Sequence, residues 1–553
     1  MFPSIKRPLR VSQLLLAIGL LAIGSADARA QSDGNPIDSW KLSLRHRVET
    51  KAGSGRFHTL TRSEDWEPKR TAVIVCDVWD AHHSINAVRR VEEMAPRIDR
   101  FVKQARESGA TVIHAPSDCM GSYVDHPARK RAVAVPASEN VPANMRQWCN
   151  QIDAEKTFKY PIDQTDGGED DDLAEHAAWA KELEAKGRNP RSPWKMQTKL
   201  ISIDDQHDFI TDSGPEIWSL MKSRRIDNVI LCGVHTNMCV LGRPFGLRNM
   251  VTAGKRVVLV RDLTDTMYNP QRWPFVNHHT GTDLIVEYIE KCICPTITSD
   301  QLLGGKPFRF QSDTRPFLVM LMAEDEYETN QTLPKFAADF LGQYFRVEFV
   351  FGSELNPNEL PGLEILNSAD AALVSIRRRP LPKDQLDIVR KFVESGKPML
   401  GIRTASHAFS LRTEKPPEDL VAWQEFDAQV LGGNYRGHHG NVALPKISIN
   451  SEQADHPILT GIGSDPFVSG SSLYITSPLA AKTKVLMSGA IDGKPAEPVA
   501  WTFERTNGGR SFYTSLGHKD DFQNPAFQRL LFNALVWASG IEKADFVIPK
   551  KDQ

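Results

Sequence analysis

The chain has 553 residues, too many for one ordinary domain, so two domains are expected. Its hydrophobic content of 41% and charged content of 25% are those of a globular protein. The formal net charge of −2 gives no sign of a polyanionic partner or a membrane-surface habit, and we expect no nucleic-acid partner.

The first 30 residues have the pattern of a secretory signal peptide. Lys6, Arg7 and Arg10 precede an apolar run at 14–24, and residues 28–30 (Ala-Arg-Ala) form an A-x-A cleavage signal. The apolar run is too short for a membrane span, and no other stretch of about 18 residues qualifies. The sequence therefore predicts export to the periplasm or the extracellular space, with no membrane span.

All seven cysteines lie before residue 295, which argues for two separately evolved domains and against a disulfide scaffold. No pairing among them is predicted. The expected organisation is a signal peptide (1–30), an N-terminal arm (31–65), a first α/β domain (66–301), a linker (302–315) and a second α/β domain (316–545).

The first domain opens with a buried strand at 71–75 that ends in Cys76 and Asp77. Asp77 is either a proton-transferring carboxylate or a cap of the following loop, and we favour the first. Asp80, His82 and His83 come next and could bind a divalent metal, although solvated loop residues are the favoured reading.

A helix at 88–108 and a strand at 111–114 are expected next. The polar stretch 121–194, which contains an acidic run at 169–172, reads as a long exposed insertion over the mouth of a site. A third strand is predicted at 200–203, with Lys199 just before it.

Residues 228–250 are the stretch around which this domain is organised. An apolar run at 229–231 predicts a buried strand, a turn follows at 233–237, and Cys239 stands at the start of a helix-like segment. The helix dipole would lower the pKa of this thiol. Open α/β sheets also place their active sites beyond the carboxyl ends of the strands, which is where Cys239 falls. Cys239 is thus either a nucleophile or a small buried residue.

The spacing Gly-Val-x-Thr-x-x-Cys-Val, followed by a helix and the strand 256–260, resembles the isochorismatase-like cysteine hydrolases. The resemblance implies a nucleophile at Cys239, a catalytic carboxylate at Asp77 and a charge-stabilising lysine, for which Lys199 is the nearest candidate.

The same resemblance implies a non-proline cis peptide at Val234–His235. We assign His235 and Thr236 to substrate binding, together with Arg243, which could bind a substrate carboxylate or simply be an exposed helix residue. Nicotinamidases bind a metal through an Asp-x-His motif. Here Asp118 is present but the motif is incomplete, so no metal and no cofactor are predicted.

A new α/β pattern follows the linker. It predicts strands at 317–322, 347–351, 371–375 and 398–402, and helices at 333–345 and 383–395. The segments 401–409, 431–433 and 508–518 resemble the trehalose-utilisation (ThuA-like) family, whose flavodoxin-like fold is that of class I glutamine amidotransferases. The predicted fold is therefore two consecutive three-layer α/β/α domains with mostly parallel sheets.

Amidotransferases carry a nucleophilic cysteine on the turn that here reads Arg403-Thr404-Ala405, and the second domain contains no cysteine. Thioester chemistry is therefore excluded there. A polar cluster remains, from which Arg403, His407, His518 and Asp520 are predicted to bind substrate, with carbohydrate weighed against a scaffold role.

Two functions are carried forward. The first is an exported hydrolase that cleaves a C–N bond of a small amide or related substrate through Cys239, with a second domain that handles carbohydrate. The alternative is a non-catalytic exported protein that binds small molecules or sugars. A homo-oligomer is compatible with either function.

Overall fold

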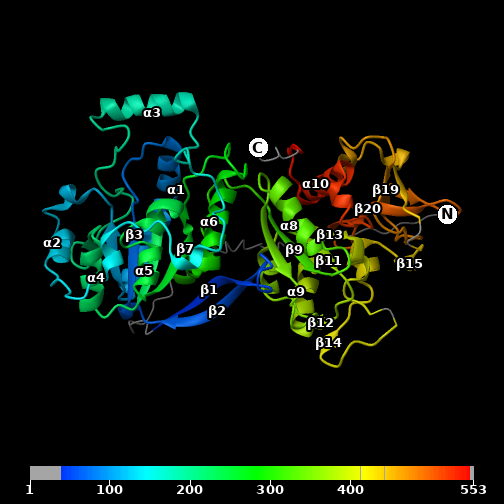
Figure 1. The fold of residues 1–553 in the computed structure, drawn as a ribbon, viewed down its shortest axis with the longest axis horizontal. Coiled ribbons are helices and arrows are strands. Elements are labelled where there is room, and N and C mark those ends of the chain that lie inside the picture. Colours follow the sequence, from blue (N-terminus) through cyan, green and yellow to red (C-terminus); the bar gives the residue numbers. More distant parts are fainter. Residues whose placement is uncertain (1–38, 412, 441–442, 548–553) are drawn as a thin grey trace, which may run out of the picture. The chain divides into compact units, whose positions relative to one another are not determined.

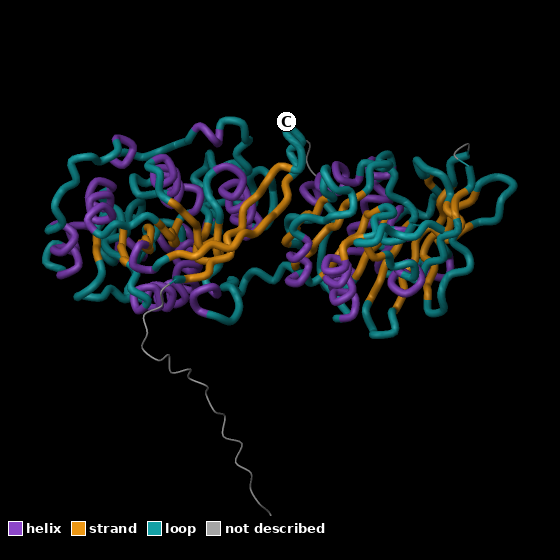
Figure 2. The backbone as a smooth tube through the Cα atoms, turned by 90° about the horizontal axis from the view of Figure 1, so that it is seen from below, coloured by secondary structure: helices purple, strands orange, loops and turns teal. Residues whose placement is uncertain are grey.

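The structure is a computed structural model that describes residues 39–411, 413–440 and 443–547. The predicted signal peptide lies outside these residues. Two large sheets, of eight and nine strands, carry the fold, and helices flank both of them (Figures 1 and 2). Within the described part of the chain, no helix has the length and apolarity needed to cross a membrane.

The first sheet has the strand order β2-β1-β8-β7-β6-β3-β4-β5. The six strands from β8 to β5 run parallel, and β1 and β2 form an antiparallel hairpin at one edge. The strands are β1 (Trp40–Glu49), β2 (Phe57–Trp66), β3 (Thr71–Cys76), β4 (Thr111–Ala115), β5 (Phe209–Ile210), β6 (Asn228–Val234), β7 (Arg256–Asp265) and β8 (Thr296–Ile297).

Alternation along the strands gives this sheet two buried faces. Val73 and Val75 of β3 pack in the cluster that contains the apolar side of α1 (Ile85–Glu107). Ala72 and Ile74 pack in the opposite cluster, with α4 (Gly214–Ser223), α5 (Leu247–Thr252) and α6 (His278–Cys292). The result is a three-layer α/β/α domain.

Two segments differ from the sequence expectation. The predicted arm contains β1 and β2, because its alternate residues Leu42 and Leu44 are buried against the sheet. The strand predicted at 200–203 is replaced by a turn, since Leu200 is exposed and β5 at Phe209–Ile210 pairs with β4 instead.

The insertion 121–194 is partly folded, with helices α2 (Pro127–Val133) and α3 (Leu173–Ala185). Its acidic run is not simply solvated. Asp171 accepts hydrogen bonds from the backbone N–H groups of Ile85 and Asn86 at the start of α1, at 3.0 and 2.9 Å. Asp170 forms an ion pair with Arg90 of α1 at 2.7 Å. The insertion is therefore anchored to the helix that covers β3.

The second sheet has the order β10-β9-β11-β13-β21-β20-β19-β16-β17. Five strands are parallel, and four antiparallel strands extend the sheet. The parallel strands are β9 (Phe317–Ala323), β10 (Arg346–Phe351), β11 (Ala371–Ile376), β13 (Met399–Ile402) and β21 (Arg510–Thr514); the others are β16 (Lys446–Ile449), β17 (Phe467–Val468), β19 (Thr483–Ala490) and β20 (Glu497–Glu504).

Helices α8 (Thr329–Phe340) and α10 (Pro525–Ser539) cover one face of this sheet, and α9 (Lys383–Glu394) covers the other. Short elements complete the chain: α7 (Asp300–Leu303), and the strand pairs β12 (Leu381–Pro382) with β14 (Leu420–Val421) and β15 (Gly437–His438) with β18 (Tyr474–Ile475). The predicted fold class of two α/β/α domains is confirmed.

Strand β6 approaches β3 closely at Gly233, near the end of β6, so a substitution at this residue tests the packing of the two strands. Its φ is +112°, and a Cβ atom there would lie 2.1 Å from the carbonyl oxygen of Cys76. We expect Gly233→Ala to lower the free energy of unfolding by about 3 kcal/mol, because neither backbone can move freely. Gly121→Ala, where a Cβ meets no atom within 4 Å, is the control in urea denaturation. Equal midpoints for the two variants would contradict this packing.

Candidate active site

Asp77 is the centre of the candidate site, directly after β3. Its side chain is fully buried, and its backbone has a φ of +48°. One carboxylate oxygen accepts a hydrogen bond from the backbone N–H of Ser117, beyond β4, at 2.7 Å. The other accepts one from Nε of Arg243 at 2.9 Å. Asp77 is thus held between groups from two neighbouring strand ends.

Cys239 lies beside this carboxylate. It belongs to the π-helical turn Thr236–Val240 that follows β6, the strand adjacent to β3. Residue Cys239 is 8% exposed, and its thiol lies close enough to the side chains of Asp77 and Arg243 for both to act on its pKa. The turn places the sulfur at the same edge of the sheet as Asp77. The structure therefore brings together the predicted nucleophile and the predicted carboxylate.

Arg243 supplies the positive charge of the site. Besides Asp77, its guanidinium reaches Asp118, with 3.4 Å between Nη2 and Oδ2. It also lies 5.7 Å from the centre of the Trp148 ring, which comes from the insertion. The reading of Arg243 as a simply exposed helix residue does not fit, because its side chain is only 20% exposed.

Lys199 is not brought to this site. It is exposed on the turn that replaces the predicted third strand, and Arg243 is the cation that contacts both Asp77 and Cys239. The sequence gives a weak signal that Arg243, rather than Lys199, is the cation near Cys239. Arg243 stands four residues after Cys239, which is about one helical turn.

The pKa of the Cys239 thiol differs from the value that the sequence led us to expect. Burial and the nearby Asp77 carboxylate raise the pKa of the Cys239 thiol well above its usual range, and Arg243 opposes this effect only in part. Burial also raises the pKa of Asp77. The expected lowering by a helix dipole is overturned, because the thiol lies in a buried turn next to a carboxylate. Burial and the carboxylate of Asp77 therefore both favour the protonated thiol over the thiolate.

An aromatic wall stands next to Asp77. The rings of Trp79 and Trp194 are stacked with centroids 4.6 Å apart, and His82 stacks on the same side. A narrow crevice of about 10 Å³ runs between Asp77, Trp79, His82 and His235. A volume of this size holds about one water molecule, and Cys239 does not line the crevice.

His235 and Thr236 follow β6. The Val234–His235 peptide bond is cis, as the resemblance implies. His235 is 2% exposed, and its Nε2 atom has no hydrogen-bond partner among the described residues. Desolvation lowers the pKa of His235 to about 3, so the ring is neutral. The hydroxyl of Thr236 bonds that of Thr264 at 2.7 Å, and it is therefore already engaged.

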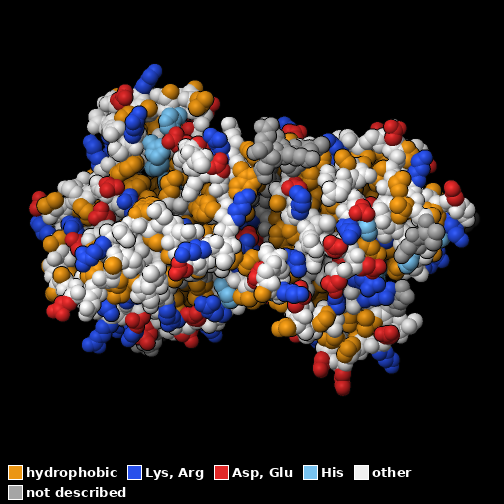
Figure 3. Space-filling model, in the orientation of Figure 1, with side chains coloured by type: hydrophobic (Ala, Val, Ile, Leu, Met, Phe, Trp, Pro, Cys, Tyr) orange, Lys and Arg blue, Asp and Glu red, His pale blue; other side chains and the backbone are white. Residues whose placement is uncertain are grey.

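The nearby acidic and histidine residues have structural partners. Asp80 accepts from the backbone N–H of Lys195 at 3.0 Å, and Nε2 of His83 lies 3.0 Å from Glu169. His82 is buried, which differs from the expected solvated loop. A group of histidines is visible beneath α3 (Figure 3). Among the described residues, no group of three or more His, Cys, Asp or Glu is placed to hold a metal.

In the second domain, Arg403 occupies the turn directly after β13. It is 1% exposed with a φ of +46°, and it donates a hydrogen bond to the carbonyl of Ser515 at 2.6 Å. Its guanidinium lies over the rings of Tyr474 and Tyr327, at 4.0 and 4.7 Å from their centres. Two tyrosines that sequence reasoning did not select therefore form part of this cluster.

His407 and His518 border the same cluster. His407 stacks on Tyr435 with centroids 4.5 Å apart, and His518 packs edge-on against Tyr327 at 5.9 Å. Asp520 is largely exposed and lies 3.4 Å from His518. Asp521, rather than Asp520, is the buried carboxylate of this loop, where it accepts from the backbone N–H groups of Gly470, Gly517 and His518.

A further buried carboxylate, Asp427, was not selected from the sequence. Burial raises its pKa to about 7, and Oδ1 has no partner among the described residues. Its other oxygen accepts from the backbone N–H of Tyr435 at 2.8 Å. The sequence around Asp427 does not single it out as a buried carboxylate, because an Asp at the start of a helical turn usually acts as a cap.

The fold and the two sites define the class of protein. Its first α/β domain has a thiol–carboxylate pair at its strand ends, and its second α/β domain has a buried arginine–tyrosine cluster. The profile of the ThuA family, described as trehalose utilisation, matches residues 320–538. This confirms a ThuA domain within the predicted second domain. A search of curated proteins found no match to the chain.

Two solved structures are similar in fold. One is a ThuA-like protein from Parabacteroides merdae, with 16% identity and a TM-score of 0.31, which covers 42% of this chain and 93% of its own. The other is a cysteine hydrolase from Pseudomonas syringae pv. phaseolicola, with 15% identity and a TM-score of 0.26, which covers 43% of this chain and 92% of its own.

Alkylation kinetics test the charge state of Cys239. We expect iodoacetamide at pH 7 to label the less buried Cys149 ahead of Cys239, because the pKa of Cys239 is raised. Asp77→Asn should speed labelling of Cys239 at pH 8, since the carboxylate disfavours the thiolate. Arg243→Gln should slow it for the opposite reason. Peptide mass spectrometry reads each site separately, and unchanged rates in both variants would refute the contacts.

Proposed function

We propose that this protein is an exported cysteine hydrolase that cleaves a C–N bond of a small amide or related substrate. The observation that supports this proposal is the position of the Cys239 thiol beside Asp77 and Arg243, which are themselves paired at 2.9 Å at one edge of the sheet. A buried carboxylate beside a thiol has the geometry that an activated nucleophile requires. A small-molecule substrate is part of this proposal, in keeping with the resemblance of the motif around Cys239.

In the proposed reaction, Asp77 takes the thiol proton as the sulfur of Cys239 attacks the carbonyl carbon of the substrate. The C–N bond then breaks, and Asp77 passes the proton to the leaving nitrogen. A thioester remains on Cys239. Water attacks it, Asp77 accepts a proton from the water, and the proton returns to the thiolate as the acid leaves. The raised pKa of Asp77 suits a group that must hold a proton between these steps.

Arg243 takes the role that sequence reasoning gave to Lys199. A guanidinium next to the sulfur offsets the negative charge that Asp77 brings to the site and stabilises the thiolate as it forms. Arginine stays protonated when buried, whereas a lysine loses its charge more readily there. The residue at 243 is therefore suited to a site as closed as this one.

Three variants separate the hydrolase from the alternative, a non-catalytic binding protein. Cys239→Ala should abolish turnover of an amide found by screening, with a nearly unchanged Tm. Arg243→Gln should lower kcat by roughly 100-fold, the scale of losing one charge-stabilising donor, and Arg243→Lys should restore part of the rate.

Lys199→Gln is the matched control and should leave kcat unchanged, because Lys199 is exposed. Full activity in Cys239→Ala would remove the hydrolase proposal. A loss of activity in Lys199→Gln with none in Arg243→Gln would return the catalytic role to the lysine.

For the ThuA domain we propose carbohydrate binding. Tyr474, Tyr327 and Arg403 combine aromatic faces with hydrogen-bond donors, and His407 and His518 border them. Such surfaces suit sugars, which present apolar ring faces as well as hydroxyl groups. Export, and assembly as a homo-oligomer, remain predictions.

The carbohydrate proposal predicts that His518→Ala weakens binding of trehalose to the full-length protein by about ten-fold, the scale of one charge-assisted or two neutral hydrogen bonds. Lys519→Ala, an exposed neighbour paired with Glu328, is the control and should bind normally. Isothermal titration calorimetry gives both affinities. Equal affinities for His518→Ala and the wild type would exclude this residue from the site.

A further inference from the structure

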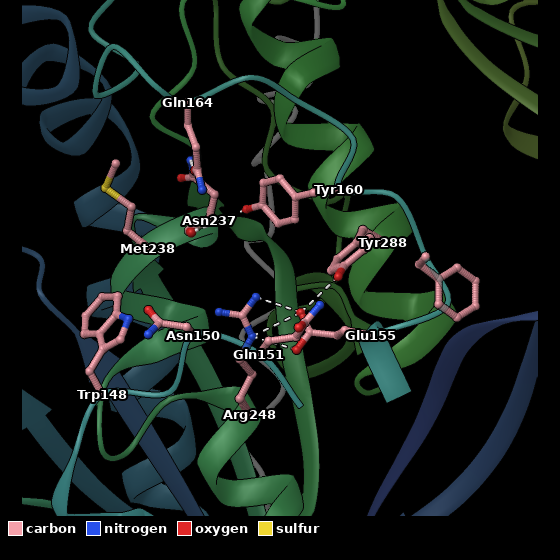
Figure 4. Close-up of a pocket in the computed structure, with 11 residues that line it drawn as sticks. Trp148, Asn150, Gln151, Glu155, Tyr160, Gln164, Asn237, Met238, Arg248 and Tyr288 are labelled. Atoms are coloured by element: carbon pink, nitrogen blue, oxygen red, sulfur yellow. Dashed lines mark hydrogen bonds and ion pairs between the residues drawn. The ribbon is translucent and has the colours of Figure 1, made fainter. Parts of the chain in front are cut away.

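The first domain contains a second cavity that the proposed hydrolase does not use. It has a volume of about 340 Å³, at the lower end of the range for small-molecule sites. Its walls come from the insertion between Trp148 and Gln164, from Asn237 and Met238, and from Arg248 and Tyr288 (Figure 4). Cys239 and Asp77 do not line it. The Trp148 indole, which packs on Gly242, lies between this cavity and Arg243.

The charged groups of the cavity neutralise each other. Glu155 is fully buried and accepts from Nε and Nη2 of Arg248, at 2.9 and 2.7 Å. The hydroxyl of Tyr288 donates to the same carboxylate at 3.0 Å. A buried pair with this many hydrogen bonds carries no net charge and offers little attraction to an ion. The ligand of this cavity is therefore uncharged.

Several amide groups remain available to a ligand. The side chains of Asn150 and Gln151 make no hydrogen bond to any described residue, and both line the cavity. Gln164 is already engaged, since its oxygen accepts from Asn237 at 2.6 Å and its side chain also contacts the Tyr160 hydroxyl. The free amides of Asn150 and Gln151 each supply both donors and acceptors.

The amides reach the cavity from different sides. In Figure 4, Gln164 points in from above, Asn150 from the left and Gln151 from below, while Tyr160 and Tyr288 form the wall on the right. The two tyrosine rings meet edge to face, with centroids 5.2 Å apart. Polar groups on several sides suit a molecule with hydroxyls around its whole rim, and aromatic rings suit the apolar face of such a molecule.

We propose that this cavity binds an uncharged polyhydroxylated ring of monosaccharide size. The proposal is independent of the hydrolase and of the carbohydrate site in the ThuA domain, because it depends only on the residues around this cavity. A planar aromatic amide fits less well, since its polar atoms lie at one edge and would leave the amides on the other sides unpaired.

Hydrogen exchange locates the binding. Full-length protein is mixed with D-glucose, or with nicotinamide as the planar comparison, and exchange is followed by mass spectrometry. We expect glucose to slow exchange in peptides that span 147–164 and 237–248. Protection confined to peptides around 403–407 and 515–521, or protection of 147–164 by nicotinamide alone, would overturn the proposal. No protection by glucose at any concentration up to 50 times that of the protein would also overturn it.

Two variants measure the contribution of the free amides. The double variant Asn150→Ala/Gln151→Ala should weaken glucose binding at least ten-fold while leaving the Tm unchanged, because these side chains have no partners in the protein. Gln147→Ala changes an exposed amide of the same segment that does not line the cavity, and it should bind glucose as the wild type does. Equal loss in both variants, or loss in neither, would refute the site.

Discussion

The buried carboxylate of Asp77 is the constraint on which the candidate active site depends. A charge removed from water is costly unless hydrogen bonds and an opposite charge replace the water. Here the backbone N–H of Ser117, the guanidinium of Arg243 and the thiol of Cys239 do so, and they come from segments that follow β4 and β6, the two strands that flank β3. The parallel sheet aligns these strand ends, so one carboxylate fixes the relative positions of the nucleophile and the cation. Burial of the thiol and the charge of this carboxylate together favour the protonated form of Cys239.

The insertion between β4 and β5 shapes both the active site and the neighbouring cavity. Its acidic residues bind the first turn and the buried arginine of α1, where the backbone N–H groups and the helix dipole favour negative charge. Once anchored in this way, the insertion places Trp194 against Trp79 and Trp148 against Gly242. A polar, weakly patterned stretch thus supplies aromatic walls that a loop in solvent could not hold in place.

The second domain uses the same strand-end geometry with different chemistry. Arg403 stands on the turn after β13, with a positive φ, and its guanidinium is enclosed by tyrosine rings and backbone carbonyls. The arginine has no nucleophilic role in such a setting. It organises a buried polar and aromatic cluster, and the proposal of carbohydrate binding depends on this cluster.

The sequence by itself determined the two α/β domains, most of their parallel strands and the choice of Asp77 and Cys239 as candidates, because apolar runs, turn residues and motif spacing are local properties. Hairpin β1–β2 escaped prediction although alternate residues of β1 are apolar, which is the pattern of a half-buried strand. The exchange of Lys199 for Arg243, the raised pKa of Cys239 and the cavity beside Arg248 were decided by the tertiary structure. Each of them depends on burial and on contacts between residues far apart in the chain, which neither composition nor spacing records.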